Sequence, residues 1–397
     1  MNEYLTALCE RVSSTKIEKP IPVGQLYFPD WERYEETFRD IFEREYYNNN
    51  GPLLTLLENK LQQYLGVKHV ICTSNATMGL MIAAQALELS GKVILPAHTF
   101  IASAQSLKWA GLEPVFCDVD SNTHHIDVSK IEALIDENVS AIMAVNLWGG
   151  ASEVSALEAL ANKHSIKLYF DSAQAFGCWI KDKAIGNFGD LEVFSFHATK
   201  ILSAGEGGCI CTNNDGLAAR IKSIRPSYGA STSVNIIKVA NARMSEAQAA
   251  IALLSFDDFE KNKKNNFNLF NQYKKRLAAI EGIELKQTAG VTCSNFQSVV
   301  CQINESIFGI SRNRLIELLK TKNILARRYF YPGTHKTIEF KSTNFELPIT
   351  DYLSESCIQL PIGAFVDIPT VDTICDVIEL IQKMPQFFDS VMSETKK

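Results

Sequence analysis

The sequence lacks an excess of basic residues. Its 39 Lys and Arg residues are outnumbered by 45 Asp and Glu residues, which gives a formal net charge of −6 and an isoelectric point near 5.8. A protein that binds nucleic acid usually carries a basic surface that neutralises phosphates. The composition therefore argues against a nucleic-acid partner, but it is compatible with a small anionic substrate held by a few local arginines.

Long apolar runs are also missing. No segment reaches the roughly 18 consecutive apolar residues that a membrane-spanning helix requires. The first ten residues, MNEYLTALCE, have neither the basic start nor the apolar stretch of a secretory signal. We therefore expect a cytoplasmic protein without a membrane partner.

Closely spaced cysteine pairs, which mark many metal sites, are scarce. Of the ten cysteines, only Cys209 and Cys211 lie close together, in a strand-like segment, and no second pair completes a zinc-binding pattern. Most of the others lie in apolar runs. We predict reduced thiols in the core and no metal site.

What the sequence does contain is an alternation of short apolar runs with longer helical patterns. Runs such as KHVICTS, GKVILPA, SIKLYFDSA and LEVFSFH are separated by stretches such as ATMGLMIAAQALEL. This alternation predicts an α/β fold with a mostly parallel sheet covered by helices on both faces. Because 397 residues exceed one simple core, we expect two domains.

The pattern changes towards the C-terminus. A long polar helical stretch around residues 244 to 280 is expected to link the two domains, and a shorter α+β pattern follows it. The predicted division is an N-terminal arm over 1–24, a large domain over 25–255, and a linker helix with a small C-terminal domain over 256–397.

Three of the apolar runs are followed by charged or polar residues that call for an explanation at the end of a buried strand. Asp171 follows SIKLYF, Lys200 comes shortly after LEVFSF, and SNAT opens a helix after HVICT. Active sites of such sheets lie at the carboxyl ends of the strands, and a buried charge there is costly without a partner. Pyridoxal phosphate explains all three, because it needs a lysine for its aldehyde, a carboxylate for its ring nitrogen and a cradle for its phosphate. An Asp–Lys ion pair and a plain helix cap are the alternatives at this point.

The chain resembles the DegT/DnrJ/EryC1/StrS family of pyridoxal-phosphate-dependent nucleotide-sugar aminotransferases over almost its whole length. The resemblance rests on the segments PAHTFIASAQSLKWAGLEPVFCDVD, DSAQAFG, GDLEVFSFHATKILSAGEGG, NARMSEAQAAI and LPIG. It implies the aspartate-aminotransferase-like architecture, fold type I, with a mostly parallel central sheet in a large domain and a smaller α+β C-terminal domain. It also implies pyridoxal phosphate as the cofactor.

The resemblance implies roles for four residues around the cofactor ring. Lys200 matches the lysine that bonds to the cofactor and then moves the proton, and Asp171 matches the partner of the ring nitrogen. Gln174 matches a residue near the ring oxygen, and Phe100 matches the aromatic that stacks on the ring.

The implied phosphate contacts come from two subunits. Ala76, Thr77 and Ser195 match the phosphate-binding residues of one chain, and Asn241 matches a residue that reaches the phosphate from the other subunit. We therefore expect a homodimer with shared active sites. The family usually has Gly at the position of Ala76 and often an aromatic residue at that of Ala242, so the cradle and the rim of the site depart from the usual pattern here.

The resemblance further implies L-glutamate as amino donor and a dTDP-4-keto-6-deoxyhexose as acceptor. Amination at C-4 would give dTDP-4-amino-4,6-dideoxy-D-glucose, a sugar for O-antigen or a related surface polysaccharide. The candidate substrate contacts are Arg225, Arg243, Arg327, Arg328, Tyr331 and His335. Surface ion pairs are the alternative reading of the arginines.

Three other functions stay open at the level of sequence. A C-3 aminotransferase would share every motif named above. A sugar dehydratase of this family has His where this chain has Lys200, and a non-enzymatic member of the same fold would not need to keep Lys200, Asp171 and Gln174.

Overall fold

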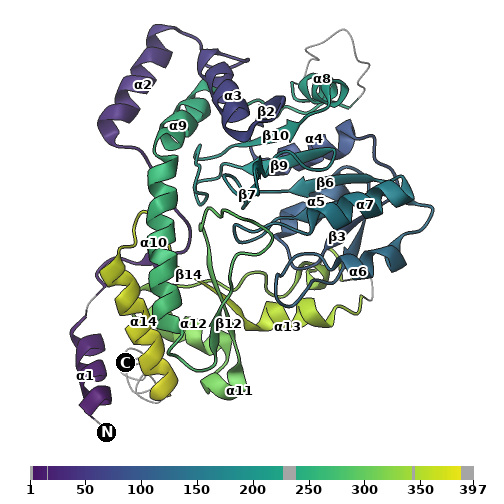
Figure 1. The fold of residues 1–397 in the computed structure, drawn as a ribbon. Coiled ribbons are helices and arrows are strands. Elements are labelled where there is room, and N and C mark those ends of the chain that lie inside the picture. Colours follow the sequence, from purple (N-terminus) through teal and green to yellow (C-terminus); the bar gives the residue numbers. More distant parts are fainter. Residues whose placement is uncertain (1–2, 16, 227–237, 342–344, 386–397) are drawn as a thin grey trace.

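A seven-stranded sheet forms the centre of the larger part of the molecule (Figure 1). The structure is a computed structural model that describes residues 3–15, 17–226, 238–341 and 345–385. In spatial order the strands are β2 (His69–Thr73), β10 (Gly208–Thr212), β9 (Leu191–Ser195), β6 (Lys167–Asp171), β5 (Val139–Val145), β3 (Lys92–Pro96) and β4 (Glu113–Cys117). Only β10 runs antiparallel to its neighbours in this sheet. The prediction of a mostly parallel sheet is confirmed.

Helices cover both faces of this sheet, which explains why the strands are apolar on both sides. One face packs against α4 (Ala76–Ala86), α5 (Ile101–Trp109) and α8 (Asp215–Ile224). The other packs against α3 (Pro52–Leu65), α7 (Val154–His164) and α9 (Glu246–Asp257). Within β10, Ile210 faces α4 while Cys209 and Cys211 face α3, because successive side chains of a strand alternate.

A second, antiparallel sheet organises the C-terminal part. It contains β11 (Ile283–Leu285), β12 (Val299–Ile303) and β14 (Cys357–Leu360) in that order. Its core includes residues of α10 (Phe259–Leu277), α12 (Arg312–Thr321) and α14 (Ile368–Lys383). The long helix α10 connects this part to the larger one (Figure 1).

The N-terminal segment packs onto the C-terminal part. Leu8 and Val12 of α1 (Glu3–Ser14) are buried in the C-terminal core, and α1 lies beside α14 (Figure 1). Strand β1 (Ile21–Pro22) pairs in parallel with β13 (Ile324–Leu325). The domain boundaries expected after residues 24 and 255 stay a prediction.

The remaining elements are short or peripheral. They are α2 (Trp31–Glu43), α6 (Val128–Ile131), β7 (Trp179–Ile180), β8 (Lys183–Ala184), α11 (Glu305–Phe308), α13 (Pro348–Ser356) and the 3-10 turns Glu132–Leu134 and Thr334–Lys336. No helix in the described residues combines the length and apolarity needed to cross a membrane. All ten cysteines are free and eight of them are buried, which confirms the prediction of reduced core thiols.

Candidate active site

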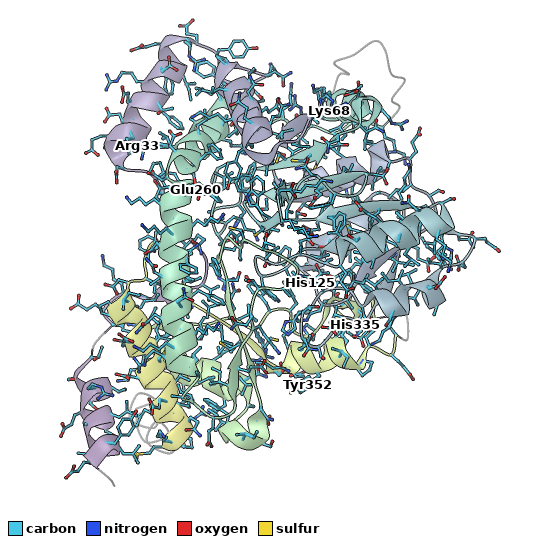
Figure 2. All side chains as sticks on the ribbon, in the orientation of Figure 1. Arg33, Lys68, His125, Glu260, His335 and Tyr352 are labelled. Atoms are coloured by element: carbon cyan, nitrogen blue, oxygen red, sulfur yellow. The ribbon has the colours of Figure 1, made fainter. Side chains whose placement is uncertain are left out.

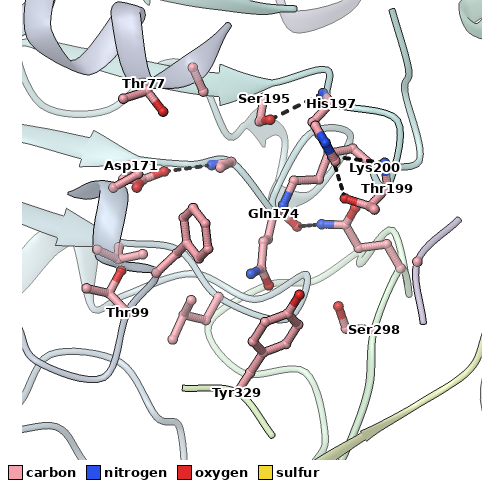
Figure 3. Close-up of a pocket in the computed structure, with 18 of the residues that line it drawn as sticks. Thr77, Thr99, Asp171, Gln174, Ser195, His197, Thr199, Lys200, Ser298 and Tyr329 are labelled. Atoms are coloured by element: carbon pink, nitrogen blue, oxygen red, sulfur yellow. Dashed lines mark hydrogen bonds between the residues drawn. The ribbon is translucent and has the colours of Figure 1, made fainter. Parts of the chain in front are cut away.

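One cavity of about 640 Å³ lies at the carboxyl ends of β6 and β9. Its wall contains most of the residues assigned to the cofactor from the sequence: Ala76, Thr77, Phe100, Asp171, Gln174, Ser195 and Lys200. Figure 3 shows Thr77 and Ser195 on one side of the cavity and Tyr329 and Ser298 on the opposite side. The cavity therefore joins the edge of the large sheet to the C-terminal part.

Lys200 lies in the loop that connects β9 to β10. The backbone N–H of Lys200 donates to the carbonyl oxygen of His197 at 2.8 Å, and the N–H of Ala198 donates to Gly205 O at 2.8 Å, so the loop is folded on itself. The N-terminal segment adds a further bond from Gln25 N–H to Thr199 O at 3.1 Å. Burial lowers the pKa of Lys200, and the nearby Asp171 carboxylate opposes that shift.

Asp171 is the last residue of β6 and is almost fully buried at the cavity wall. Its Oδ2 accepts a hydrogen bond of 2.7 Å from the hydroxyl of Ser103, and its Oδ1 accepts one of 3.1 Å from the N–H of Ala173. Burial raises the pKa of Asp171 despite these two bonds and the charge of Lys200. A cationic group placed against this carboxylate would offset the cost of its burial.

The first turn of α4 presents Ala76 and Thr77 to the cavity. The side chain of Asn75 caps the helix by accepting from Met78 N–H at 2.9 Å. A Cβ atom at Gly208 would lie 2.8 Å from Ala76 N, so only glycine lets β10 approach this turn so closely. A helix start with its N–H groups and partial positive charge is suited to a phosphate.

Gln174 and Phe100 complete the predicted ring contacts. The Oε1 atom of Gln174 accepts a hydrogen bond of 3.0 Å from Trp148 N–H, which fixes the orientation of the side-chain amide at the cavity. Phe100 immediately precedes α5, lines the cavity and is 56% exposed. A large aromatic ring that is this open to a cavity has a free face for stacking.

The segment around Asn241 lies outside the cavity wall of its own chain. The N–H of Ser74 donates to Ala242 O at 2.8 Å, which ties this segment to the loop before α4. The Arg243 guanidinium donates to Oδ1 of Asn241 at 3.0 Å and to Oδ1 of Asn49 at 2.6 Å. The contribution of Asn241 to a partner's phosphate site stays a proposal.

The other predicted substrate residues divide into two groups. Arg327 lines the cavity and is exposed. Arg225 is only 5% exposed and donates at 2.9 Å to both Glu58 Oε1 and the Cys72 carbonyl oxygen, which places it in an internal ion pair away from the cavity.

Two aromatic candidates and Arg328 also lie apart from the cavity wall. His335 is buried beside α13 (Figure 2), where its Nε2 lies 3.0 Å from Oδ1 of Asp351, and burial lowers its pKa. The ring of Tyr331 stacks under the Arg328 guanidinium at 4.3 Å from ring centroid to Cζ.

Several cavity residues had no sequence signal. Val23 and Gly24 belong to the N-terminal segment and form part of the wall. Ser298, just before β12, and Gln359, within β14, form another part. Ser103 does not line the cavity, but it bonds to Asp171 from α5, and the sequence analysis missed it as well.

The comparisons with known proteins agree with this geometry. The profile of the DegT/DnrJ/EryC1/StrS aminotransferase family matches residues 30–379. The chain belongs to this family. It is 38% identical to the dTDP-4-amino-4,6-dideoxy-D-glucose transaminase of Shigella dysenteriae over 317 residues, 80% of this chain and 86% of the relative.

Two further similar proteins are described with different nucleotides, one with GDP and one with TDP. The GDP-perosamine synthase of Caulobacter vibrioides is 32% identical over 290 residues, 71% of this chain and 77% of the relative. The crystal structure of DesI in the presence of its TDP-sugar product superimposes with a TM-score of 0.90 at 32% identity, covering 99% of this chain and 100% of that one.

The protein is therefore a sugar aminotransferase with fold type I, and pyridoxal phosphate is its cofactor. The cavity fits this cofactor on its own geometry. It contains a lysine, a buried carboxylate whose pKa is raised, an exposed aromatic ring and a helix start that glycine keeps open. Lys200 and Asp171 would hold the ring, and Ala76, Thr77 and Ser195 would hold the phosphate.

Proposed function

We propose that this enzyme transfers the amino group of L-glutamate to C-4 of dTDP-4-keto-6-deoxy-D-glucose, with dTDP-4-amino-4,6-dideoxy-D-glucose and 2-oxoglutarate as products. The observation that carries the proposal is the 38% identity to a transaminase named for that product, over 80% of this chain. The likeness to DesI, whose structure is described with a TDP-sugar product, supports the same class of nucleotide.

The chemistry divides between the cofactor and the chain. Bound pyridoxal phosphate supplies an electron-withdrawing ring that stabilises negative charge on the carbon that loses its proton. Asp171 stabilises positive charge at the ring nitrogen, and Ser103 orients its carboxylate. Lys200 must accept a proton as a neutral amine, and its lowered pKa increases the neutral fraction.

The acceptor is proposed to enter from the side of the C-terminal part. Arg327 lines that side of the cavity and is the arginine we assign to the pyrophosphate, because a guanidinium binds two phosphate oxygens at once. Ser298 and Tyr329 lie on the same side and offer hydroxyl groups to the sugar (Figure 3). Arg243 is the candidate contact from a partner subunit.

A homodimer is the proposed active form. Helix α2 packs against α9 with one side, and its aromatic residues Trp31 and Phe42 are 66% and 65% exposed. Phe28 and Tyr47, just outside the helix, are 53% and 51% exposed. An aromatic surface of this kind is typical of a protein interface, and a second copy of this chain would cover it.

The sharing of active sites can be tested by mixing two defective proteins. Lys200→Ala removes the lysine, and Asn241→Asp places a negative charge where a partner's phosphate is proposed to bind. If sites are shared, a mixed dimer has one site with both defects and one intact site, so activity returns on mixing after subunit exchange. A mixture that stays as inactive as its components, with heterodimers shown by native mass spectrometry, would contradict the role of Asn241.

The substrate is tested by incubating the holoenzyme with L-glutamate and dTDP-4-keto-6-deoxy-D-glucose and locating the new nitrogen by NMR. We expect amination at C-4 and none with the Lys200→Ala protein. Nitrogen at C-3 of the 3-keto isomer would establish the C-3 alternative, and loss of water without amination would establish a dehydratase. Because the Caulobacter relative is named for a GDP-sugar, the GDP-linked 4-keto-6-deoxyhexose is assayed in parallel. A higher kcat/KM for it would overturn the dTDP assignment.

A further inference from the structure

Three potential metal ligands meet where the two sheets approach each other. His98 follows β3, His124 lies in the loop after β4, and Cys357 is the first residue of β14. One ligand atom from each residue lies within 4.8 Å of the others. The three residues are 0%, 1% and 0% exposed, respectively. The sequence did not predict this cluster, because its members are 26 and 233 positions apart.

The two imidazoles have no hydrogen-bond partner in the described part of the chain. All four ring nitrogens of His98 and His124 are buried without one. The rings meet edge to face, with centroids 5.6 Å apart and an interplanar angle of 85°, and they do not bond to each other. Buried polar atoms are nearly always satisfied, so two such neighbouring rings call for a water or an ion.

Burial disfavours charge on all three side chains of the cluster. Burial lowers the pKa of His98 to about 3 and that of His124 to about 2, so both rings are neutral and keep a free lone pair. Burial raises the pKa of the Cys357 thiol to about 12. A bound metal would displace the thiol proton, which then leaves to solvent, and the thiolate would bind the ion.

We propose that His98, His124 and Cys357 bind one zinc ion. Two imidazole nitrogens and one thiolate form a donor set that zinc prefers, with a water or other small ligand in the fourth tetrahedral position. Zn–N and Zn–S bonds near 2.0 and 2.3 Å place tetrahedral ligand atoms roughly 3.3–3.6 Å apart. Side-chain shifts of about 1 Å would therefore close the present arrangement around an ion.

Apolar side chains and several charged groups surround the cluster. Cys357 belongs to a buried apolar cluster that also contains Trp148 and Phe330, and both of these rings contact His98. The indole N–H of Trp148 is also without a partner in the described residues. Lys286 acts on both His124 and Cys357, and Arg312 acts on Cys357, so two cationic side chains repel an ion here. Lys286 pairs with Glu284 Oε1 at 3.2 Å, and the Asp118 carboxylate acts on His98 with the opposite sign, so both acids moderate that repulsion.

The proposed ion is a structural link and does not touch the cofactor. It would join the loops after β3 and β4 of the large sheet to β14 of the second sheet. His98 is adjacent to Thr99 and two residues before Phe100, both of which line the cavity. Zinc would thus fix the cavity wall on which the cofactor ring is expected to stack.

The test is the metal content of tag-free protein purified without added metal or chelator. We expect about one zinc per chain by mass spectrometry of the metal. We also expect a thiolate-to-cobalt absorption band after replacement with Co(II). Cys357→Ala should lose both signals, and the matched variant Cys375→Ala, which removes a buried thiol from α14, should keep both.

The zinc content is measured both with and without bound pyridoxal phosphate, so the result does not depend on amino-transfer activity. The proposal is overturned if folded wild-type protein, after incubation with zinc and removal of the excess, contains no more zinc than Cys357→Ala. Buried water would then satisfy the imidazoles. If Cys357→Ala does not fold, X-ray absorption at the zinc edge of the wild-type protein decides instead, and a first shell without sulfur overturns the proposal equally.

Discussion

The hydroxyl of Ser103 donates a hydrogen bond of 2.7 Å to Oδ2 of Asp171. Ser103 in turn lies 2.9 Å, Oγ to Oγ1, from Thr99 at the cavity wall. The three side chains form a buried polar chain that runs from α5 to the end of β6. Because the bond goes to a carboxylate, it stabilises the ionised form that a cationic ring nitrogen requires.

Replacing Ser103 by Ala should therefore weaken catalysis without unfolding the protein. A hydrogen bond to a charged group contributes about 1.5–3 kcal/mol, so we expect kcat/KM to fall roughly 10- to 100-fold. Ser106→Ala is the matched control, since Ser106 is buried on the same helix and its hydroxyl bonds only to the Ser103 carbonyl oxygen among the described residues. Equal kinetics for the two variants would contradict the positioning role of Ser103.

Arg225 should behave as a structural residue. Its guanidinium neutralises Glu58 within the protein, and removing one partner of a buried ion pair commonly costs about 3–5 kcal/mol. Arg225→Met is thus expected to lower the melting temperature strongly, while Arg225→Met combined with Glu58→Leu recovers part of the loss. A stable Arg225→Met protein with a raised KM for the nucleotide sugar would instead support the substrate role expected from the sequence.

Arg327 should show the opposite behaviour, because it is exposed at the cavity. Loss of one charged hydrogen-bonding contact to a pyrophosphate is worth about 1.5–3 kcal/mol, so Arg327→Gln should raise the KM for the nucleotide sugar roughly tenfold or more. The melting temperature and the KM for L-glutamate should hardly change. Steady-state kinetics with each substrate varied in turn separate this result from a general loss of activity.

The sequence was informative wherever a local pattern determines the structure. Strands buried on both faces have continuous apolar runs, so β3, β6 and β9 were visible. The strand-like segment that contains Cys209 and Cys211 is β10, where alternation places both sulfurs on one face, 3.9 Å apart. The antiparallel direction of β10 carries no such signature.

Contacts between distant segments were not predictable in the same way. Arg225 pairs with Glu58, which is 167 positions away in the sequence. An arginine in the sequence looks the same whether it binds a buried carboxylate of the protein or an anionic substrate. Val23 and Gly24 reach the cavity because the pairing of β1 with β13 and the bond from Gln25 N–H to Thr199 O hold the N-terminal segment there. The meeting of His98 with Cys357 likewise depends on how the two sheets pack.

Gly51 is required because the Glu246 side chain lies very close to it. Its backbone φ of −68° is one that any residue can adopt. A Cβ atom there would lie 2.4 Å from Cδ of Glu246, whose carboxylate accepts the first free N–H groups of α3. We expect Gly51→Ala to destabilise the protein by about 2–3 kcal/mol. Gly216→Ala, where the new atom meets Asn214 Oδ1 at 3.4 Å within α8, should be neutral or stabilising by up to about 1 kcal/mol. Melting curves of the two variants provide the comparison.

Glu192 should make stability depend on pH near neutrality. This residue of β9 is fully buried, and its carboxylate accepts hydrogen bonds from Ser172 Oγ at 2.5 Å, Gly186 N–H at 2.6 Å and Phe188 N–H at 3.0 Å. Burial outweighs these bonds and raises the pKa of Glu192 from 4.5 to about 7. Between these two values the folded protein keeps a proton that the unfolded chain has lost. The contribution of Glu192 to stability is therefore largest below the lower pKa, declines as pH rises through this window, and is constant above it.

Glu192→Gln removes this titration and keeps an oxygen acceptor for the two N–H groups. Other titrating groups are the same in both proteins, so the difference between their stabilities isolates Glu192. We expect the variant to gain on the wild type by roughly 3 kcal/mol as pH rises through the window. Melting temperatures of both holoenzymes, measured from about pH 5 to pH 8.5, test this. A difference that does not vary with pH would mean that Glu192 is ionised throughout, with its three hydrogen bonds outweighing the cost of burial.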